Sequence, residues 1–588
     1  MIQQRRFTGA LLVVTLLAVC SNAATKPNLV LITLDSARAD RMGFLGAKAG
    51  LTFNLDRLAA ESLVFEHAYA QAPGTVVSHA TILSGAYPQT TGMSEIGGTL
   101  PSSLPYLPDL LKAQGYRTAA FVSTIDLDPS NGPAQGFDRG FQTYQAGAGT
   151  ASVGTANVGT ANVGTGDSPV QAERSSAAKS GQHSFQRRPD QAVTSAAAWL
   201  TRNAPAPFFL WIHLAATGHA AASYNAALTA EDAAIGKLLA ILHQQKLDAT
   251  TAVVVAAAHG ESLGAHGEDT HGIFLYDETI HVPLLVKLPG SQASAKKVSA
   301  KVRLADIAPT LLEIAGVSVP SQMQGQSLLW IARAATAPDQ PIYSRADLPQ
   351  RGFGWSALES WRAGKYLYIR APKPELYDLI ADPGATRNLA QGSKATLDTM
   401  AAQLESFDRR FTGEGGKFPG AELSSSEMQK LASLGYVGLQ KSATASAAVS
   451  GMDAKDKIAV ANQVIEAAER SKPDQAIAAL TPITAADPNL YLAQYALGIA
   501  LAQKGEHAEA ARHLHKAIEL QPDSAWAHYA IGAALIKTGD YKTATIHLEI
   551  AATRLPNYAP AHQALAEAYD HSGRSDDAKK ERSKAGQK

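Results

Sequence analysis

Three kinds of side chain in this sequence could build a reactive site, and the first two are a carboxylate and a hydroxyl. Asp35 directly follows the apolar run Asn28 to Leu34, and open α/β sheets place ligand-binding groups just beyond the ends of their strands. Thr75 shortly precedes a predicted helix from Ser78 to Leu83. Taken singly, either residue would simply cap a helix. Beside a divalent cation, the metal and the helix dipole would both favour the alkoxide of Thr75 as a nucleophile.

The third kind of side chain is histidine, which is concentrated in one region. Seven of the 17 histidines lie between His213 and His281. Three of these, His219, His259 and His271, fall at predicted strand ends or in Gly-rich loops. A single histidine in such a loop is ordinarily solvated. Several on adjacent loops indicate a metal site, because imidazole binds zinc well.

The elements that must position these residues alternate between strands and helices. Continuous β-branched and aliphatic runs predict strands at residues 28–34, 118–123, 208–214, 251–257 and 282–288. Such runs suit a parallel sheet that helices cover on both faces. One intervening helix is predicted from Leu107 to Gln114, where Gly115 ends it.

Length and composition limit the classes of protein. A chain of 588 residues exceeds what one hydrophobic core holds, so two or more domains are expected. Hydrophobic residues make up 46% and charged residues 18%, as in ordinary soluble globular proteins. Lys and Arg together equal Asp and Glu at 52 each, so the charge balance argues against a nucleic-acid partner.

The N-terminus reads as a targeting segment. Two arginines precede an apolar run from Ala10 to Val19, and small residues follow as far as Ala23. This pattern is typical of a secretory signal peptide at residues 1–23, so we expect an exported protein, periplasmic or secreted. The only cysteine, Cys20, ends a run that resembles a bacterial lipobox, and lipidation is therefore the alternative. Cleavage near Ala23 is favoured because Val19 is bulky for the position before a lipidated cysteine.

Two low-complexity stretches divide the rest of the chain. The first domain is predicted at residues 24–411, interrupted at 146–188 by Gly-, Ser- and Thr-rich sequence that repeats Thr-Ala-Asn-Val-Gly. This insertion can bury too little apolar area to order itself, so a flexible surface loop is expected. The second stretch, 412–452, is predicted to link the first domain to an Ala-rich helical part at 453–588.

The helical part has a period of 34 residues. Pro488, Pro522 and Pro556 follow that interval, and small residues such as Gly498 and Gly532 keep the same register. This spacing resembles the tetratricopeptide repeat (TPR), in which small residues let paired helices approach and proline follows the second helix. We therefore expect an all-α TPR solenoid that binds a protein partner. A generic helical bundle is the alternative.

The first domain resembles the sulfatase-like members of the alkaline phosphatase superfamily. The similarity rests on opening, nucleophile, metal-binding and closing motifs, and on a linker motif often found before TPRs in such proteins. These segments are 28–40, 54–59, 72–88, 259–272, 375–388 and 434–437. The resemblance implies an alkaline-phosphatase-like α/β sandwich with a central, mostly parallel sheet. It also implies a metal-dependent hydrolase of sulfuric or phosphoric esters.

The resemblance assigns catalytic roles to two residues. Thr75 stands where true sulfatases carry the Cys or Ser that is oxidised to formylglycine, and His79 stands where an arginine would be. Threonine cannot give that aldehyde, so this segment is more similar to the phosphodiesterase and phosphoglycerol-transferase branches. There the threonine attacks phosphorus in line, and water or an alcohol displaces the phospho-enzyme. Thr75 and His79 are the predicted catalytic residues.

The resemblance also implies two metal subsites, each of which has lost a carboxylate. One would use Asp35, Thr75, Ala258 and His259, and the other Ala216, His219 and His271. The family carries aspartate in place of Ala258 and of Ala216 or its neighbour Ala215. Losing even an indirect partner of a metal costs about 10- to 100-fold in affinity. We therefore expect one divalent ion (Zn, Mn, Ca or Mg) or none.

These features leave two main functions open. The first is a hydrolase of phosphate or sulfate esters, in a small molecule, a glycan or a lipid, weakened by the two alanines. The second is an inactive pseudoenzyme in which the fold persists as an extracytoplasmic scaffold for TPR-bound partners. A third possibility makes the repeats the working part and the α/β domain a passenger, although its loop motifs remain recognisable.

Overall fold

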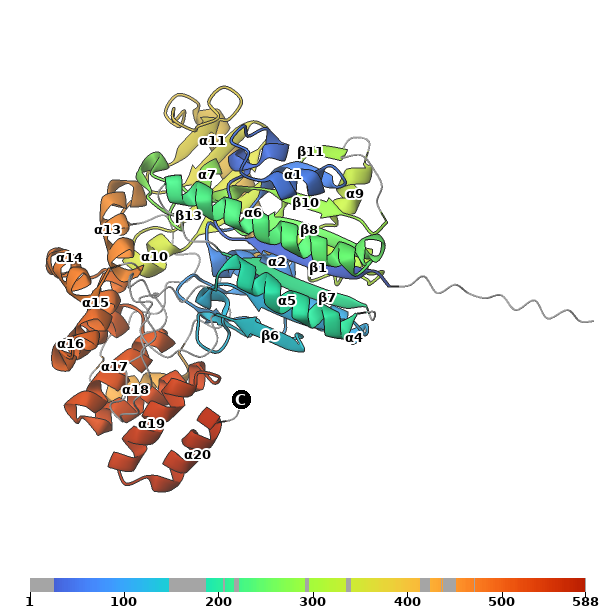
Figure 1. Cartoon of the computed structure of the whole chain (residues 1–588). Coiled ribbons are helices and arrows are strands. Elements are labelled where there is room, and N and C mark those ends of the chain that lie inside the picture. The colour runs from blue at the N-terminus through green and yellow to red at the C-terminus, as the bar shows by residue number, and fades with distance from the viewer. Residues whose placement is uncertain are drawn as a thin grey trace, which may run out of the picture.

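A computed structural model describes residues 26–147, 187–204, 207–215, 221–290, 296–334, 340–412, 423–434, 436, 451–469 and 471–586 (Figure 1). Several sequence predictions fall outside these residues. They are the signal peptide with Cys20, nearly all of the predicted insertion, Ala216 and His219. Among the helices in the described part of the chain, none combines the length and apolar composition that crossing a bilayer requires.

The core of the first domain is a mixed sheet, in the order β11-β2-β10-β8-β1-β7-β4-β6. Its centre consists of the parallel strands β8 (Thr251–Ala257), β1 (Asn28–Leu34), β7 (Phe208–Leu214) and β4 (Arg117–Val122). Three of these match their predicted bounds, and all residues of β8, β1 and β7 are buried. The sequence pattern was a good guide here because these strands have apolar side chains on both faces.

The outer strands give the sheet its mixed character. β6 (Thr143–Ala146) extends it parallel to β4. On the other side, β10 (Leu284–Lys287) runs antiparallel to both β8 and β2 (Leu63–Tyr69). β2 pairs in turn with β11 (Lys296–Arg303) and with the short β9 (His281–Val282). The strand predicted at 282–288 therefore exists in shorter form and points the opposite way to its neighbour β8.

Helices cover both faces of this sheet. Alternate residues of β7 point to opposite faces, and Trp199 of α5 (Pro189–Asn203) contacts Phe208, whereas His79 of α2 (Thr75–Ser84) contacts Trp211. The helices α5 and α6 (Ala221–Gln244) thus lie on one face and α2 on the other (Figure 1). α4 (Leu107–Ala113) confirms the helix predicted before Gly115.

A second sheet closes the first domain. β12 (Ile342–Ala346), β13 (Leu358–Ala363), β14 (Tyr366–Arg370) and β15 (Glu375–Asp378) form an antiparallel meander that packs against α11 (Lys394–Thr412). Aromatic rings of Tyr343, Trp361 and Phe407 fill the space between them. The sequence analysis did not predict this sheet.

The C-terminal part consists of paired helices, as predicted. They are α13 (Ile458–Glu469), α14 (Pro473–Ala486), α15 (Tyr491–Gln503), α16 (His507–Leu520), α17 (Ala525–Thr538), α18 (Tyr541–Arg554), α19 (Ala559–His571) and α20 (Ser575–Gly586). A Cβ atom added to Gly532 of α17 would lie 2.5 Å from Leu548 Cγ of α18. One added to Gly498 would lie 2.6 Å from Leu514 Cγ. The small residues therefore permit the close helix pairing that the repeat pattern predicts.

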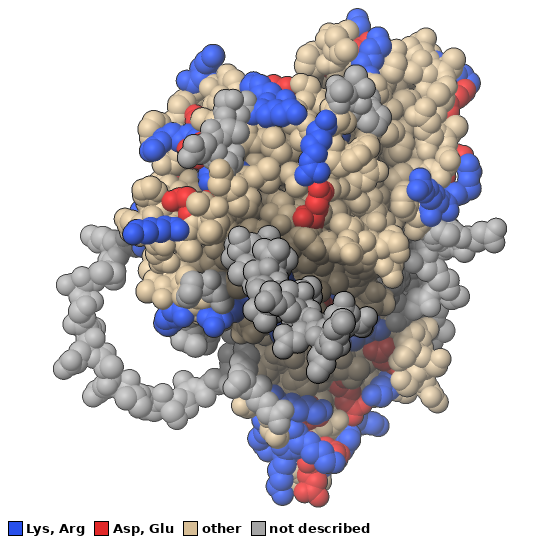
Figure 2. All heavy atoms as spheres, turned by 90° about the vertical axis from the view of Figure 1, so that its right-hand side faces the viewer, with Lys and Arg blue, Asp and Glu red and all other residues tan. Residues whose placement is uncertain are grey.

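The repeats dock against the first domain through polar contacts. Arg351 of α10 (Leu348–Phe353) pairs with Asp523 at 3.0 Å. Asn462 of α13 donates to the carbonyl of Gly267 at 2.8 Å. The short helix α12 (Ser425–Ser433) packs on α18. Figure 2 shows Lys and Arg side chains interspersed with Asp and Glu on one face of the molecule, in line with the balanced composition.

Candidate functional site

The carboxyl ends of three neighbouring strands bring the predicted site residues together. Asp35 follows β1, and His259 follows β8 after one intervening residue. Thr75 is the first residue of α2, with Gly74 as its N-cap, so the helix begins three residues earlier than the predicted Ser78.

Asp35, Thr75 and His259 form a compact triangle. The Thr75 hydroxyl donates to Asp35 Oδ1 at 3.0 Å and lies 3.1 Å from His259 Nε2, which is 3.0 Å from the same Oδ1. The Nδ1 atom of His259 lies 2.8 Å from the Gly260 carbonyl oxygen, so it carries a proton and leaves Nε2 to face the other two groups.

Asp35 and His259 each stabilise the charged form of the other. Burial alone would lower the pKa of His259, but its hydrogen bond to Asp35 and the charge of that carboxylate raise the pKa to about 9. Burial likewise opposes ionisation of Asp35, yet His259 holds the pKa of Asp35 far below its ordinary range. Without a cation, these protein groups would therefore satisfy one another as an imidazolium–carboxylate pair with the threonine between them.

His79 lies beneath Thr75, between α2 and the sheet. Its Nδ1 is 2.7 Å from the Thr75 carbonyl oxygen and its Nε2 is 2.9 Å from Thr33 Oγ1, and the ring is fully buried. Burial lowers the pKa of His79 to about 3, so the ring is neutral. It cannot supply the positive charge of the arginine for which it stands, and its contacts fix the start of α2.

His271 is brought to the same site. Its ring centroid lies 4.2 Å from that of His259, and its Nδ1 is 3.2 Å from Glu261 Oε2. Glu261 is fully buried and was not a predicted site residue. Its closeness to His271 depends on the conformation of the loop between them, for which the sequence carried no separate signal. Glu261 orients the His271 ring.

Sequence reasoning also missed His213, at the penultimate position of β7. Its Nε2 lies 4.0 Å from Asp35 Oδ1, and burial lowers the pKa of His213 to about 4. Neither ring nitrogen has a hydrogen-bond partner among the described residues. A buried polar group of this kind calls for a water, an ion or a ligand. The signal available in the sequence was a histidine next to the end of an otherwise apolar strand.

The strand register locates the two substituted positions. Leu34 is level with Leu214 and with Ala257, so Asp35 lies between Ala215 and Ala258 at the ends of the three strands. Both alanines are buried. The described residues thus place Ala215 beside Asp35, whereas Ala216 and His219 lie outside them.

A second carboxylate caps the start of α2. Glu95 accepts hydrogen bonds from the backbone N–H groups of Val76 and Val77 at 3.2 and 3.0 Å. Burial raises the pKa of Glu95 to about 7. Its negative charge suits the positive end of the helix dipole. These two amides are consequently occupied and do not cradle a substrate oxyanion in this arrangement.

The donor set fits one divalent cation. Asp35, Thr75 and His259 supply a carboxylate, a hydroxyl and an imidazole whose donor atoms lie 3.0–3.1 Å from one another. Ligands at about 2.0–2.2 Å from one cation are separated by roughly this distance, and three protein ligands leave an open position for substrate. Ala258 adds no donor. Within the described residues, no group of three or more His, Cys, Asp or Glu side chains is placed to hold a metal, so this set reaches three donors only through the Thr75 hydroxyl.

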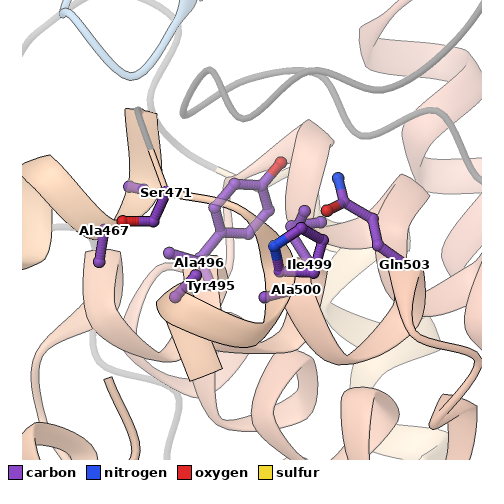
Figure 3. Close-up of a pocket in the computed structure, with 10 residues that line it drawn as sticks. Ala467, Ser471, Tyr495, Ala496, Ile499, Ala500 and Gln503 are labelled. Atoms are coloured by element: carbon purple, nitrogen blue, oxygen red, sulfur yellow. The ribbon is translucent and has the colours of Figure 1, made fainter. Parts of the chain in front are cut away.

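The repeats contain a small pocket of a different kind. It lies between α13, α14 and α15, measures about 20 Å³ and is lined by residues that include Ala467, Tyr495 and Ile499 (Figure 3). Space of this size holds about one water molecule. It is a packing gap between repeat helices rather than a cleft for a partner.

Family models match nearly the whole of the first domain. The Sulfatase model matches residues 27–317, and the model for the C-terminal part of N-sulphoglucosamine sulphohydrolase matches residues 267–409. A TPR repeat model matches residues 498–539.

Curated relatives agree with these models. An ulvan-active sulfatase of Formosa agariphila is 28% identical over 419 residues, which cover 65% of this chain and 80% of the relative. A Delta 4,5-hexuronate-2-O-sulfatase of Bacteroides thetaiotaomicron is 24% identical, with 64% and 88% covered. Arylsulfatase K of Mus musculus is 34% identical over a shorter match that covers 29% of this chain and 32% of the relative.

Solved structures share the fold of the first domain. A 2-O GAG sulfatase superposes with a TM-score of 0.51 at 20% identity, covering 66% of this chain and 93% of that one. The phosphonate monoester hydrolase of Agrobacterium radiobacter superposes with a TM-score of 0.52 at 17% identity, covering 66% and 96%. The fold is thus the alkaline-phosphatase-like α/β domain followed by paired helices. The chain belongs to the sulfatase family of the alkaline phosphatase superfamily, whose members hydrolyse sulfuric ester bonds, and it carries a C-terminal TPR repeat.

Proposed function

We propose that this protein hydrolyses a phosphate or sulfate ester with Thr75 as the nucleophile. The observation that carries the proposal is the position of the Thr75 hydroxyl, at the first residue of α2 and within 3.1 Å of both Asp35 Oδ1 and His259 Nε2. A hydroxyl in such a place is oriented by the carboxylate and stabilised as an alkoxide by the helix dipole.

Each residue of the site has a role in the displacement at phosphorus or sulfur. Thr75 Oγ1 attacks phosphorus or sulfur while the bond to the ester oxygen breaks, and the hydroxyl proton passes to the Asp35 carboxylate, to which the hydroxyl already donates. The departing alcohol takes up this proton from Asp35 as it leaves. Water then displaces the threonyl ester, releases phosphate or sulfate and restores the hydroxyl.

A divalent cation held by Asp35, Thr75 and His259 would supply positive charge that favours the alkoxide. His271, which Glu261 orients through Nδ1, presents its other ring nitrogen as a hydrogen-bond donor or acceptor for a substrate oxygen. Its ring is tilted by 38° against that of His259, which in turn lies 3.1 Å from the Thr75 hydroxyl.

The names of the relatives support a glycan as substrate. An ulvan-active sulfatase and a hexuronate-2-O-sulfatase both match about two thirds of this chain. We infer that the ester is carried by a sulfated or phosphorylated glycan, and that the predicted signal peptide delivers the enzyme to the periplasm or the exterior. The repeats would bind a protein partner there.

A scaffold without catalytic activity is the second candidate, and one observation favours it. Ala215 and Ala258 flank Asp35, so among the three described residues that directly follow β7, β1 and β8 only Asp35 has a carboxylate. If the site binds its metal too weakly to retain it, hydrolysis is lost. The docked repeats would then carry the function of the protein by binding a partner.

Metal content and hydrolysis together test the proposal. The chain from Ala24 onward is dialysed against trace Zn, Mn, Ca or Mg, analysed for bound metal, and assayed with p-nitrophenyl sulfate, p-nitrophenyl phosphate and bis(p-nitrophenyl) phosphate. We expect bound metal, together with hydrolysis that Thr75→Val abolishes and Thr75→Ser partly retains. Hydrolysis that survives Thr75→Val would refute Thr75 as nucleophile. A folded, metal-free and inactive protein would support the scaffold.

A further inference from the structure

A short loop after β8 carries two residues of the candidate site at its ends, Glu261 and His271. Residues 262–270 form the loop between them. The loop folds back on itself, since the backbone N–H of Ser262 donates to the Thr270 carbonyl oxygen at 2.7 Å. This bond joins the direct neighbours of Glu261 and His271, so the contact between those two side chains depends on how the loop is held.

Two residues of the 262–270 loop have strained backbone conformations. Leu263 and His266 both have a φ of 54°, in the left-handed region that residues other than glycine rarely adopt. Such conformations persist only where the surrounding structure holds them. We therefore expect the loop to relax toward other conformations when its outer contacts are lost.

The first domain holds one side of this loop through an aromatic stack. The His266 ring lies on the Tyr276 ring, with a centroid distance of 3.7 Å and an interplanar angle of 17°. The Tyr276 hydroxyl donates to Glu375 Oε2 at 2.6 Å, and Lys455 Nζ donates to Glu375 Oε1 at 2.5 Å. Because Lys455 shortly precedes α13, the residue that supports the stack is itself connected to the start of the repeats.

One side chain of α13 bonds to the tip of the loop through both of its polar atoms. Asn462 Nδ2 donates to the Gly267 carbonyl oxygen at 2.8 Å, and Asn462 Oδ1 accepts from the backbone N–H of Asp269 at 3.2 Å. Ile458 lies four residues earlier, on the same face of the helix. A Cβ atom added to Gly267 would lie 3.4 Å from Ile458 Cγ2. The repeats therefore contact the loop directly as well as through Glu375.

We propose that Asn462 is a positioning residue of the candidate site. By bonding to the backbone on both sides of Glu268, it holds the 262–270 loop in the strained conformation in which Glu261 orients His271. The site is then complete only when α13 is docked, so the repeats contribute to it by holding a loop of the first domain. This role rests on the proposed function in so far as His271 acts on the ester, whereas the orientation of His271 can be measured without hydrolysis.

Nuclear magnetic resonance of isotope-labelled histidine in the chain from Ala24 onward tests this role. At a pH well above the ordinary histidine pKa of about 6.5, the nitrogen shifts of a ring show which nitrogen has the proton. The His271 signal is assigned by its loss in His271→Gln. In the parent we expect one fixed tautomer, because Glu261 contacts only Nδ1 of His271. In Asn462→Ala we expect that signal to change, with no single tautomer retained.

Hydrogen exchange follows the loop itself in the same variant. Amide exchange across residues 260–272 should quicken by about tenfold in Asn462→Ala, the factor that corresponds to losing one or two hydrogen bonds. Alanine favours a helix more than asparagine does, so α13 should remain folded, and thermal unfolding checks this. If the parent hydrolyses a test ester, Asn462→Ala should also lower kcat/KM by about tenfold or more through the misplaced His271.

Gln463→Ala is the matched control, because it removes an amide side chain from the adjacent, exposed position of the same helix. It should leave the His271 signal, the exchange of the loop and any hydrolysis as in the parent. An inactive parent would count against the proposed function alone, since the His271 signal can still respond to Asn462→Ala. The positioning role is overturned if folded Asn462→Ala keeps the parent's His271 signal or the parent's exchange in the loop. It is also overturned if an active parent and Asn462→Ala hydrolyse the ester equally fast, or if Gln463→Ala changes the His271 signal as much as Asn462→Ala does.

Discussion

The backbone N–H of Ala258 donates to the carbonyl oxygen of Leu34 at 2.9 Å, which holds Ala258 beside the residue that follows Leu34, Asp35. Ala258 is fully buried, and its methyl group supplies no donor to a cation there. We predict that Ala258→Asp raises the affinity for Zn or Mn by at least about tenfold. Competition with a coloured chelator measures this affinity independently of any activity.

The thermal stability of Ala258→Asp should also reveal metal binding. A second buried carboxylate beside Asp35 repels it, so metal-free Ala258→Asp should melt below the parent, and added metal should more than reverse the loss. Ala258→Val changes volume without adding a donor and serves as the control. A folded Ala258→Asp variant with unchanged affinity would show that the alanine is not what limits metal binding.

His79 provides a second test, because it occupies the place of the family's arginine. Its ring is fully buried between Thr75 and Thr33, in edge contact with His213. An arginine at position 79 would bury its positive charge between Thr75 and Thr33. Neither of these two residues has a carboxylate to pair with that charge. We predict that His79→Arg lowers the free energy of unfolding by about 3 kcal/mol or more, as measured by urea denaturation.

His79→Gln is the matched control, since an amide can keep hydrogen bonds to the Thr75 carbonyl and the Thr33 hydroxyl. Its cost should be smaller than that of His79→Arg. The contrary result is a His79→Arg variant that is as stable as the parent and binds sulfate. In that case an arginine can take the place of the histidine, and the packing of His79 is not needed to hold α2.

Prediction from sequence succeeded where burial on two sides made the pattern unambiguous. β1, β7 and β8 are apolar along their whole length, and their bounds were found to the residue. β2 contains Glu66 and His67, and β11 carries several lysines, because strands toward the margin of a sheet meet solvent. Because polar and apolar residues are mixed in both strands, neither strand was predicted from the sequence. The antiparallel pairing of β10 with β2 was therefore not predicted either.

The site was predictable in its residue types but not in its contacts. Asp35, Thr75 and His259 could be named because each follows or begins an element whose end was recognisable. His213 looked like part of an apolar strand, and only the register with β1 reveals its approach to Asp35. Glu261 and Glu95 reach the site from loops, whose paths no periodicity specifies.

The close approach of the repeat helices makes a third prediction. Gly532 faces Leu548 so closely that a Cβ atom would lie 2.5 Å from Leu548 Cγ. Gly532→Ala should therefore lower stability by about 1–3 kcal/mol through overpacking, despite the better helix propensity of alanine. Thermal unfolding of the full chain measures the loss.

A compensating change checks the cause. Leu548→Ala removes the obstructing side chain, so the double variant should lose less than the sum of the two single losses. The next repeat already has Ala566 in place of the glycine, with Arg582 in place of the leucine. Additive losses in the double variant would mean that the glycine serves some purpose other than making room for Leu548.

The last prediction concerns pH and the buried histidine pair of the repeats. His528 Nδ1 lies 2.9 Å from His547 Nδ1, and both rings are almost wholly buried. Burial lowers the pKa of His528 to about 4 and holds the pKa of His547 well below its ordinary value. An unfolded histidine has a pKa of about 6.5. Between pH 6.5 and pH 4 the unfolded chain therefore binds protons that the folded repeats do not.

Stability must then rise with pH across that window, and it is lost as pH falls from about 6.5 to about 4. The shift of His528 alone corresponds to about 3 kcal/mol. His528→Gln should flatten this part of the pH profile in thermal unfolding, because glutamine does not titrate. His571→Gln, at an exposed position of α19, should leave the slope unchanged. An unchanged slope in His528→Gln would show that the pair does not control acid stability of the repeats.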